Sequence, residues 1–149
     1  MTVTLLSTAI HNYLITGKAD LAALVGDNIT KNKLLKRDLK GSGEAAIVIK
    51  VSGGDAPRGN SLGSPRVNIY IYADNTKVDG DVLTEDAEDR MWTIFHTLDP
   101  YLNWMNREYR TIDTVDIIGS LRGVEPQILE DEDIGMPYLW TAYDMSLVY

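Results

Sequence analysis

A stretch of strict alternation constrains the fold of this chain more than any other feature of its sequence. In residues 66–73 (RVNIYIYA), aliphatic residues alternate with Asn68, Tyr70 and Tyr72. Side chains in a strand point to opposite faces in turn, so this pattern predicts a strand with one apolar face and one face that carries tyrosines. Residues 45–51 (AAIVIKV), which are rich in β-branched side chains and bounded by glycines, predict a second strand just before it.

Two further strands are expected in the second half of the chain. Residues 138–149 (YLWTAYDMSLVY) alternate as well, with Leu139 on one face and Trp140 on the other. Residues 114–123 (TVDIIGSLRG) predict a strand in which Gly119 marks a β-bulge.

Apolar residues at helical spacing predict three helices. The first covers residues 5–14 and ends at Gly17, and the second runs from Asp20 to Gly26. The longest covers residues 79–98, and its acidic first turns suit the positive end of the helix dipole.

The long helix is expected to stop at Asp99-Pro100, because the residue before a proline disfavours helical backbone angles. One of its faces is predicted to be buried on the sheet, since it carries six apolar residues: Leu83, Ala87, Met91, Ile94, Phe95 and Leu98.

The order of these elements is helices, two strands, a long helix and two strands. It lacks the regular alternation of strand and helix that builds parallel sheets, so the predicted class is α+β. We expect a mainly antiparallel sheet of about four strands, with the N-terminal helices and the long helix packed on one face. A length of 149 residues fits a single domain that covers residues 1–149.

Three connections are expected to be long loops. Residues 27–43 are polar and lysine-rich, with a short strand near Ile29. Residues 53–65 are rich in Gly, Ser and Pro and join two adjacent strands. Residues 125–137 precede the last strand and hold the acidic cluster 130–133. Long loops in small domains are usually functional, and one that orders against a partner fits a subunit of an assembly.

The charge balance narrows the classes of partner. Lys and Arg number 14 and Asp and Glu number 22, which gives a formal net charge of −8. Such a charge argues against tight binding to nucleic acids and against docking on anionic membranes. No basic leader or long apolar run is present, so a soluble protein made in a cytoplasm is expected.

Catalytic and cofactor chemistry finds little support. The chain has no cysteine and two histidines, which leaves few ligands for a metal. Residues 54–61 match the glycine spacing of a phosphate-binding loop, but Asn60 stands where its lysine is required. Residues 75–86 match part of a calcium loop, but Lys77 occupies a ligand position. We therefore expect no enzymatic activity, no cofactor and no metal.

The aromatic residues carry a stronger signal, which concerns assembly. Tyrosine and tryptophan are enriched at protein interfaces, and three of them lie on strand faces opposite the aliphatic residues. If helices covered both faces of the sheet, these same residues would instead belong to the core. With the residues of the glycine-rich hairpin, the candidate assembly interface is Arg58, Asn60, Leu62, Arg66, Tyr70, Tyr72 and Trp140.

Taken as a whole, the chain resembles the tail-terminator, or tail-completion, proteins of long-tailed bacteriophages, also named minor-capsid or head–tail joining proteins. The resemblance rests on the N-terminal helix, LAALVGDNI, the strand pair AAIVIKV and RVNIYIYA, the acidic segment VLTEDAEDRMWTIFHTL and the terminal YLWTAYDMSLVY. It implies an α+β fold and a homohexameric ring that caps the tail tube and joins it to the head connector. Phage DNA would pass through this ring.

The resemblance places the protein in the virion, at the tail or neck, after synthesis in the host cytoplasm. Its expected partners are copies of itself, the major tail tube protein and the head connector or completion protein. Two alternatives stay open. One is a head-completion or stopper protein of the same neck. The other is a small acidic enzyme or ligand-binding α+β domain with its site at residues 53–65.

Overall fold

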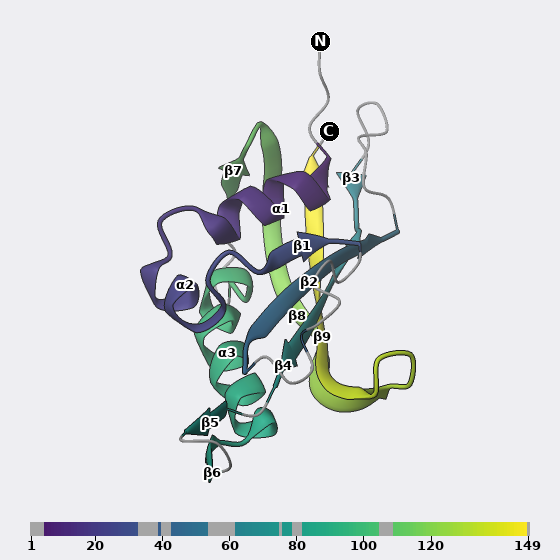
Figure 1. Ribbon diagram of the computed structural model, residues 1–149. Helices are drawn as coiled ribbons and strands as arrows, with labels where there is room; N and C mark the ends of the chain where they lie inside the picture. The colour runs from purple at the N-terminus through teal and green to yellow at the C-terminus, as the bar shows by residue number, and fades with distance from the viewer. Residues whose placement is uncertain are drawn as a thin grey trace.

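The computed structural model describes residues 5–32, 39, 43–53, 62–74, 76–78, 82–104 and 109–148. Within them, three helices pack on a curved sheet of seven strands (Figure 1). The α+β class expected from the sequence is confirmed. The sheet has more strands than expected, because short strands are added beside the four long ones.

The strands of this sheet are β1 (Ile29–Lys31), β2 (Ala45–Ser52), β3 (Leu62–Gly63), β4 (Arg66–Ala73), β7 (Arg110–Ile112), β8 (Val115–Asp131) and β9 (Met136–Val148). Their order is β1-β2-β4-β9-β8-β7, and β3 pairs with β9. The β1–β2 pair is parallel and the other pairs are antiparallel, so the sheet is mixed.

The alternating stretch forms β4, whose bounds are those predicted, in the middle of the sheet. Ile69 and Ile71 are fully buried on the face that the helices cover. Ile47 and Ile49 of β2 pair with them in register and extend the same apolar surface. One main hydrophobic core therefore lies between the helices and this inner face of the sheet.

Helix α1 covers Leu6–Ile15 and helix α2 covers Ala19–Val25. Gly17 and Gly26 follow them with φ of +66° and +60°, where side chains other than that of glycine are strained. Both helix ends were predicted from these glycines. Of the helices that the structure describes, none has the length and apolar character needed to cross a bilayer.

Replacing Gly26 by alanine is expected to lower the free energy of unfolding by roughly 1–3 kcal/mol. An added Cβ would meet no atom within 4 Å, so the loss arises from the backbone angles alone (φ +60°, ψ −130°). Gly119→Ala is the matched control, because that position is equally open and its φ is not positive. Chemical denaturation of both variants measures the difference, and equal stabilities would contradict the expectation.

The long helix begins later than predicted. Helix α3 covers Ala87–Leu102, whereas residues 79–98 were expected. Ahead of it lies a small separate hairpin of β5 (Thr76–Val78) and β6 (Val82–Glu85). The β-branched residues in this segment favour strand pairing over an extra helical turn. Asp86, with an extended backbone, then occupies the N-cap position.

Pro100 does not end α3, contrary to expectation, and lies inside its last turn. A proline removes one backbone N–H, which is most damaging in the middle of a helix. Here Leu98 and Leu102 are both fully buried, and the N–H of Asn103 donates to the carbonyl of Asp99 at 2.7 Å. Burial of Leu102 outweighs the lost hydrogen bond.

Residues 125–137 do not form the predicted loop. β8 continues to Asp131 and β9 begins at Met136, so a turn at 132–135 joins two long strands. Register shifts in β8 leave Pro126 without a ladder partner, which is where a strand tolerates proline. Another shift, next to Gly119, confirms the predicted bulge. The hairpin curls away from the helices, at the lower right of Figure 1.

A second, smaller hydrophobic cluster lies on the outer face of the sheet, opposite the helices. It consists of Leu39, Ala46, Val48, Tyr72 and Met136. Met136 comes from the start of β9, so the curled hairpin supplies part of this cover. The outer face is thus covered at the hairpin end, whereas the helices cover the inner face.

Candidate assembly surface

The seven residues predicted for the assembly interface fall into three groups. Arg58 and Asn60 lie outside the described residues. Leu62 begins β3, whose backbone pairs with Val148 near the end of β9. The remaining four lie on the outer face of two neighbouring strands: Arg66, Tyr70 and Tyr72 on β4, and Trp140 on β9.

The register of β4 and β9 brings Tyr70 and Trp140 opposite each other. Both are half-buried, and the indole N–H of Trp140 donates to Oδ1 of Asn68 at 3.2 Å. Arg66 of β4 pairs with Asp144 of β9 on the same face. Their side chains form a two-point ion pair, with N–O distances of 2.8 and 3.2 Å. Strand pairing therefore brings four of the seven predicted residues onto one face, and their role in assembly stays a prediction.

Tyr72 is more deeply placed than the others, because only 8% of it is exposed. Its ring centre lies 5.4 Å from that of Tyr138, and Tyr138 lies 5.8 Å from Tyr70. The Tyr72 hydroxyl donates to Oδ2 of Asp131 at 3.1 Å. Tyr72 is therefore a packing residue within one chain, whereas Tyr70 and Tyr138 are only partly buried.

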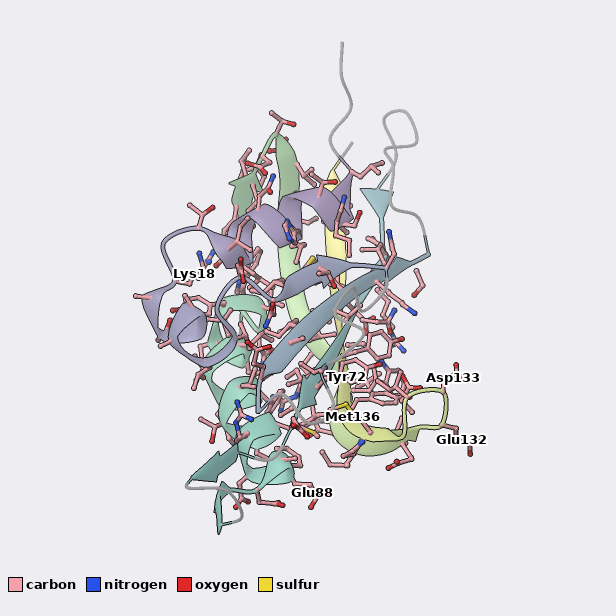
Figure 2. The ribbon with its side chains drawn as sticks, viewed as in Figure 1. Lys18, Tyr72, Glu88, Glu132, Asp133 and Met136 are labelled. Atoms are coloured by element: carbon pink, nitrogen blue, oxygen red, sulfur yellow. The ribbon has the colours of Figure 1, made fainter. Side chains whose placement is uncertain are left out.

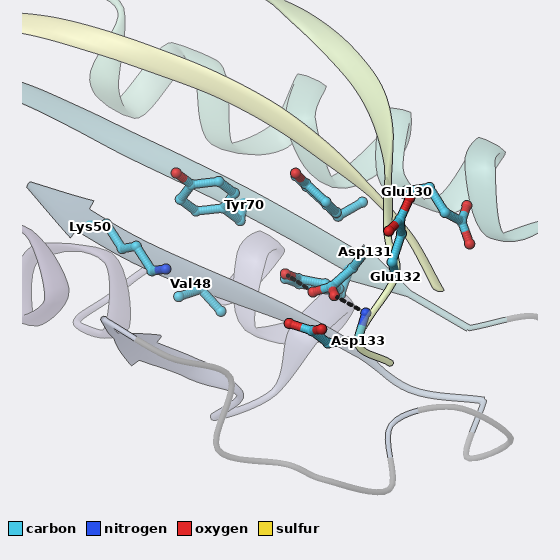
Figure 3. Close-up of a pocket in the computed structure, with 9 residues that line it drawn as sticks. Val48, Lys50, Tyr70, Glu130, Asp131, Glu132 and Asp133 are labelled. Atoms are coloured by element: carbon cyan, nitrogen blue, oxygen red, sulfur yellow. Dashed lines mark hydrogen bonds between the residues drawn. The ribbon is translucent and has the colours of Figure 1, made fainter. Parts of the chain in front are cut away.

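A cavity of about 460 Å³ opens beside these rings (Figure 3). Val48, Lys50 and the tyrosines form its floor. The end of β8 and the turn that follows it form its acidic rim: Glu130, Asp131, Glu132 and Asp133. Among the described residues, none of these four carboxylates is paired with a lysine or an arginine. The cavity is strongly anionic and repels phosphate groups.

Sequence reasoning missed Tyr138, Lys50 and the acidic rim as parts of one surface. Tyr138 lies two residues from Trp140 and shares its face by strand alternation, so the pattern contained this signal. The acidic rim was predicted to lie in a loop. The pairing of β8 with β9 brings it beside the tyrosines of β4.

An open strand edge is the second feature of this surface. β7 pairs only with residues 115–117 of β8, and Trp104 donates one backbone hydrogen bond to Ser120. The N–H of Arg122 donates to Oδ1 of Asn103 at 3.2 Å, and from Ser120 to Asp131 no described strand pairs with the outer edge of β8. Leu121 and Leu129 along this part are 53% and 38% exposed. Unpaired edges with apolar side chains are templates for pairing with another chain.

The protein is expected to lose stability in alkali through the ionisation of Tyr72. Burial, followed by the hydrogen bond to Asp131, raises the pKa of its phenol above the ordinary value of 10.0. The unfolded chain therefore releases this proton first, so the contribution is complete below pH 10.0 and is lost as the pH rises further.

The loss in the free energy of unfolding approaches about 1.4 kcal/mol for each pH unit above the ordinary pKa of tyrosine. Denaturant unfolding on either side of pH 10 measures it, and Tyr72→Phe should lose stability less steeply than the unmodified chain. Equal slopes for the two proteins would contradict the assignment.

These surfaces are suited to binding. Among the described residues, no group of three or more His, Cys, Asp or Glu side chains has an arrangement that could hold a metal ion. Half-buried aromatic rings, an exposed ion pair and an open strand edge are typical of surfaces that contact other proteins. In comparisons with known proteins, no family model, curated protein or solved structure matches the chain.

Proposed function

We propose that the chain is a structural subunit of a phage virion, a tail terminator that forms a ring, caps the tail tube and joins it to the head connector. The single observation that carries the proposal is the open outer edge of β8. The kind of assembly, a ring on the tail tube, is taken from the resemblance of the sequence to tail-terminator proteins. The α+β fold agrees with that resemblance.

The open edge suits contact between subunits. A neighbouring chain that lies along β8 gains main-chain hydrogen bonds and covers Leu121 and Leu129. Burying a whole leucine contributes about 1.5–3 kcal/mol, so two that are about half exposed contribute on the order of 2 kcal/mol together. When one surface meets a different surface of the next copy, the assembly closes into a ring if the rotation allows it.

The net charge suits a channel for DNA. Six subunits, the number that the resemblance implies, carry 6 × (−8) = −48 formal charges. A lumen with an excess of carboxylates repels the phosphate backbone and lets the genome pass without being held.

The protein is therefore expected to bind duplex DNA no more tightly than about 10⁻⁴ M at ~150 mM salt. A titration of labelled duplex with the purified protein measures this affinity. Sub-micromolar binding would contradict the passive channel and point to the basic stretch at residues 31–40.

The function is tested by producing the protein together with a major tail tube protein encoded in the same genome. Electron microscopy should show rings with a central hole, seated at one end of tubes of limited length. Rings that bind a head connector but never a tube would favour a head-completion protein. Absence of rings, with tubes that grow without limit, would refute the proposal.

The strand edge is tested by a matched pair of variants. Leu121→Lys should weaken ring formation, because it places a charge within the proposed contact. Ile15→Lys introduces the same charge at a residue that is 50% exposed at the end of α1, and it should leave rings intact. Equal effects of the two substitutions would remove the edge of β8 from the interface.

A further inference from the structure

The small hairpin of β5 and β6 stands apart from the main sheet. Among the described strands these two pair only with each other, and they have little contact with the rest of the described chain. Figure 1 shows them below the main sheet, beside the start of α3. A two-stranded hairpin on its own is marginally stable in water, and a third strand or a packed face stabilises it. The hairpin therefore has a strand edge to offer to another sheet.

The open edge of β8 contains a stretch that is regular enough to accept such a strand. As far as Arg122, the backbone groups of Trp104 and the side chain of Asn103 take up part of the edge, and register shifts follow up to Gln127. Residues 127–131 then pair with 136–140 of β9 without interruption, and no described strand lies on their other side. A strand of three residues, such as β5, can form a regular ladder of main-chain hydrogen bonds there.

The two faces of this stretch differ in their chemistry. Leu129 lies on the outer face, opposite Tyr138, and is exposed. On the inner face, a cavity of about 540 Å³ separates the end of β8 from the start of α3. Glu88 of α3 and Met136 of β9, both labelled in Figure 2, are among the residues that line it. The acidic residues in the lining are Asp74, Asp86, Glu88 and Glu130, and no described lining residue is basic.

The sequence of β5 matches these two faces. Its residues are Thr76, Lys77 and Val78, and strand alternation places Lys77 on the face opposite to the other two. The register of the hairpin puts Val82 of β6 beside Val78. When β5 lies along β8 with Lys77 on the inner face, the lysine charge meets the acidic cavity and the two valines meet Leu129. Opposite charges and apolar side chains on neighbouring strands are both stabilising pairs.

We propose that the β5–β6 hairpin of one copy adds to the β8 edge of the next copy at residues 127–131, so that β5 extends the main sheet of its neighbour. The inference rests on the proposed ring and names a contact within it. The hairpin and the edge are two different surfaces, and a head-to-tail contact of this kind closes into a ring when the rotation allows it. Main-chain hydrogen bonds supply affinity, and the charge of Lys77 fixes the orientation of the added strand.

Charge reversal on each side tests the contact. Lys77→Glu and, separately, Glu130→Lys should each weaken self-association at low salt by at least about tenfold, measured by sedimentation. Mixing the two weakened proteins should restore association, because each hairpin then meets an edge of opposite charge.

Asp89→Lys is the matched control for Glu130→Lys. It makes the same change of charge at an exposed residue of α3 that does not line the cavity, and it should leave association unchanged. Equal effects of the two substitutions, or a mixture that stays dissociated, would overturn the proposal.

Cross-linking shows whether the contact joins two copies or closes within one. The chain has no cysteine, so Lys77→Cys on the hairpin and Glu130→Cys on the edge introduce the only thiols. When the two single variants are mixed at millimolar concentration with a short bis-maleimide, mixed dimers should exceed dimers of either protein alone. The double variant should give chains of linked copies. A cross-link inside one chain, or no preference for mixed dimers, would contradict the contact between copies.

The outcomes separate this contact from the proposed function. If rings form on tail tubes while Lys77→Glu has no effect on them, the hairpin contact is wrong and the terminator function stands. If mixing the charge-reversed proteins restores association but no ring or tube cap forms, the contact stands and the function falls.

Discussion

Ile94→Asp is expected to abolish soluble folding. Ile94 is 1% exposed in the middle of α3, on the face that packs into the main core. A carboxylate there has no partner, and a buried unpaired charge destabilises a protein by several kcal/mol, in addition to the lost packing of the isoleucine. A domain of this size is stable by roughly 5–15 kcal/mol in all, so one substitution removes most of it.

Thr93→Asp is the matched control, because it introduces the same carboxylate one residue earlier on the exposed side of α3. Its effect should be small, and it should remain soluble with the circular dichroism spectrum of the unmodified chain. Ile94→Val, which keeps an apolar side chain, should cost only about 0.5–1.5 kcal/mol. Near-native stability of Ile94→Asp would mean that α3 presents a different face to the sheet.

The sequence predicted the centre of the fold because burial there follows the period of each element. β4 was placed to the residue, since Val67, Ile69 and Ile71 face a core while Tyr70 and Tyr72 face away. A strand buried mainly on one face leaves a period of two in the sequence, and such a signal needs no knowledge of its neighbours.

The outer part of the β8–β9 hairpin, residues 124–137, was missed for the opposite reason. In residues 121–130 exposed and partly exposed positions alternate, and none is buried. Both faces of this stretch meet solvent, so selection for apolar residues on one face is absent. Pairing with β9 and the register shifts that curve it arise from tertiary contacts, which local patterns do not contain.

The candidate site was predicted in part. Alternation along each strand placed Tyr70 and Trp140 opposite the aliphatic residues of their own strands. That the two residues are neighbours follows only from the pairing of β4 with β9. The acidic rim was not predicted as part of this surface, because it meets Lys50 and the tyrosines only through contacts between residues far apart in the chain.

Asp99→Ala is expected to destabilise the protein by about 3 kcal/mol, although Asp99 is on the surface side of the core. Oδ2 of Asp99 accepts a hydrogen bond from Nη1 of Arg122 at 3.0 Å, and Oδ1 accepts one from the hydroxyl of Tyr143 at 2.7 Å. One carboxylate thus ties the last turn of α3, including Pro100, to both β8 and β9.

The loss is large because Tyr143 cannot reach water and Arg122 reaches it only in part. Tyr143 is fully buried, and burial followed by the bond to Asp99 raises the pKa of its phenol far above the ordinary value. The Arg122 side chain is 25% exposed and lies over the ring of Phe95, and its Nε is buried with no described hydrogen-bond partner. Without Asp99, the hydroxyl of Tyr143 stays buried and unsatisfied, and Arg122 keeps only its longer pair with Glu125, at 3.7 Å.

The chain provides its own comparison, since Arg66 and Asp144 form an ion pair of similar geometry whose side chains are 41% and 49% exposed. Asp144→Ala is expected to cost no more than about 1 kcal/mol, because water replaces the lost contact. Denaturant unfolding of both variants measures the contrast between a shielded and an open pair. Adding Arg122→Met to Asp99→Ala should recover part of the loss by removing the stranded charge. If the two aspartate variants were equally stable, the network around Asp99 would contribute no more than a surface ion pair, and burial of Leu102 alone would hold the end of α3.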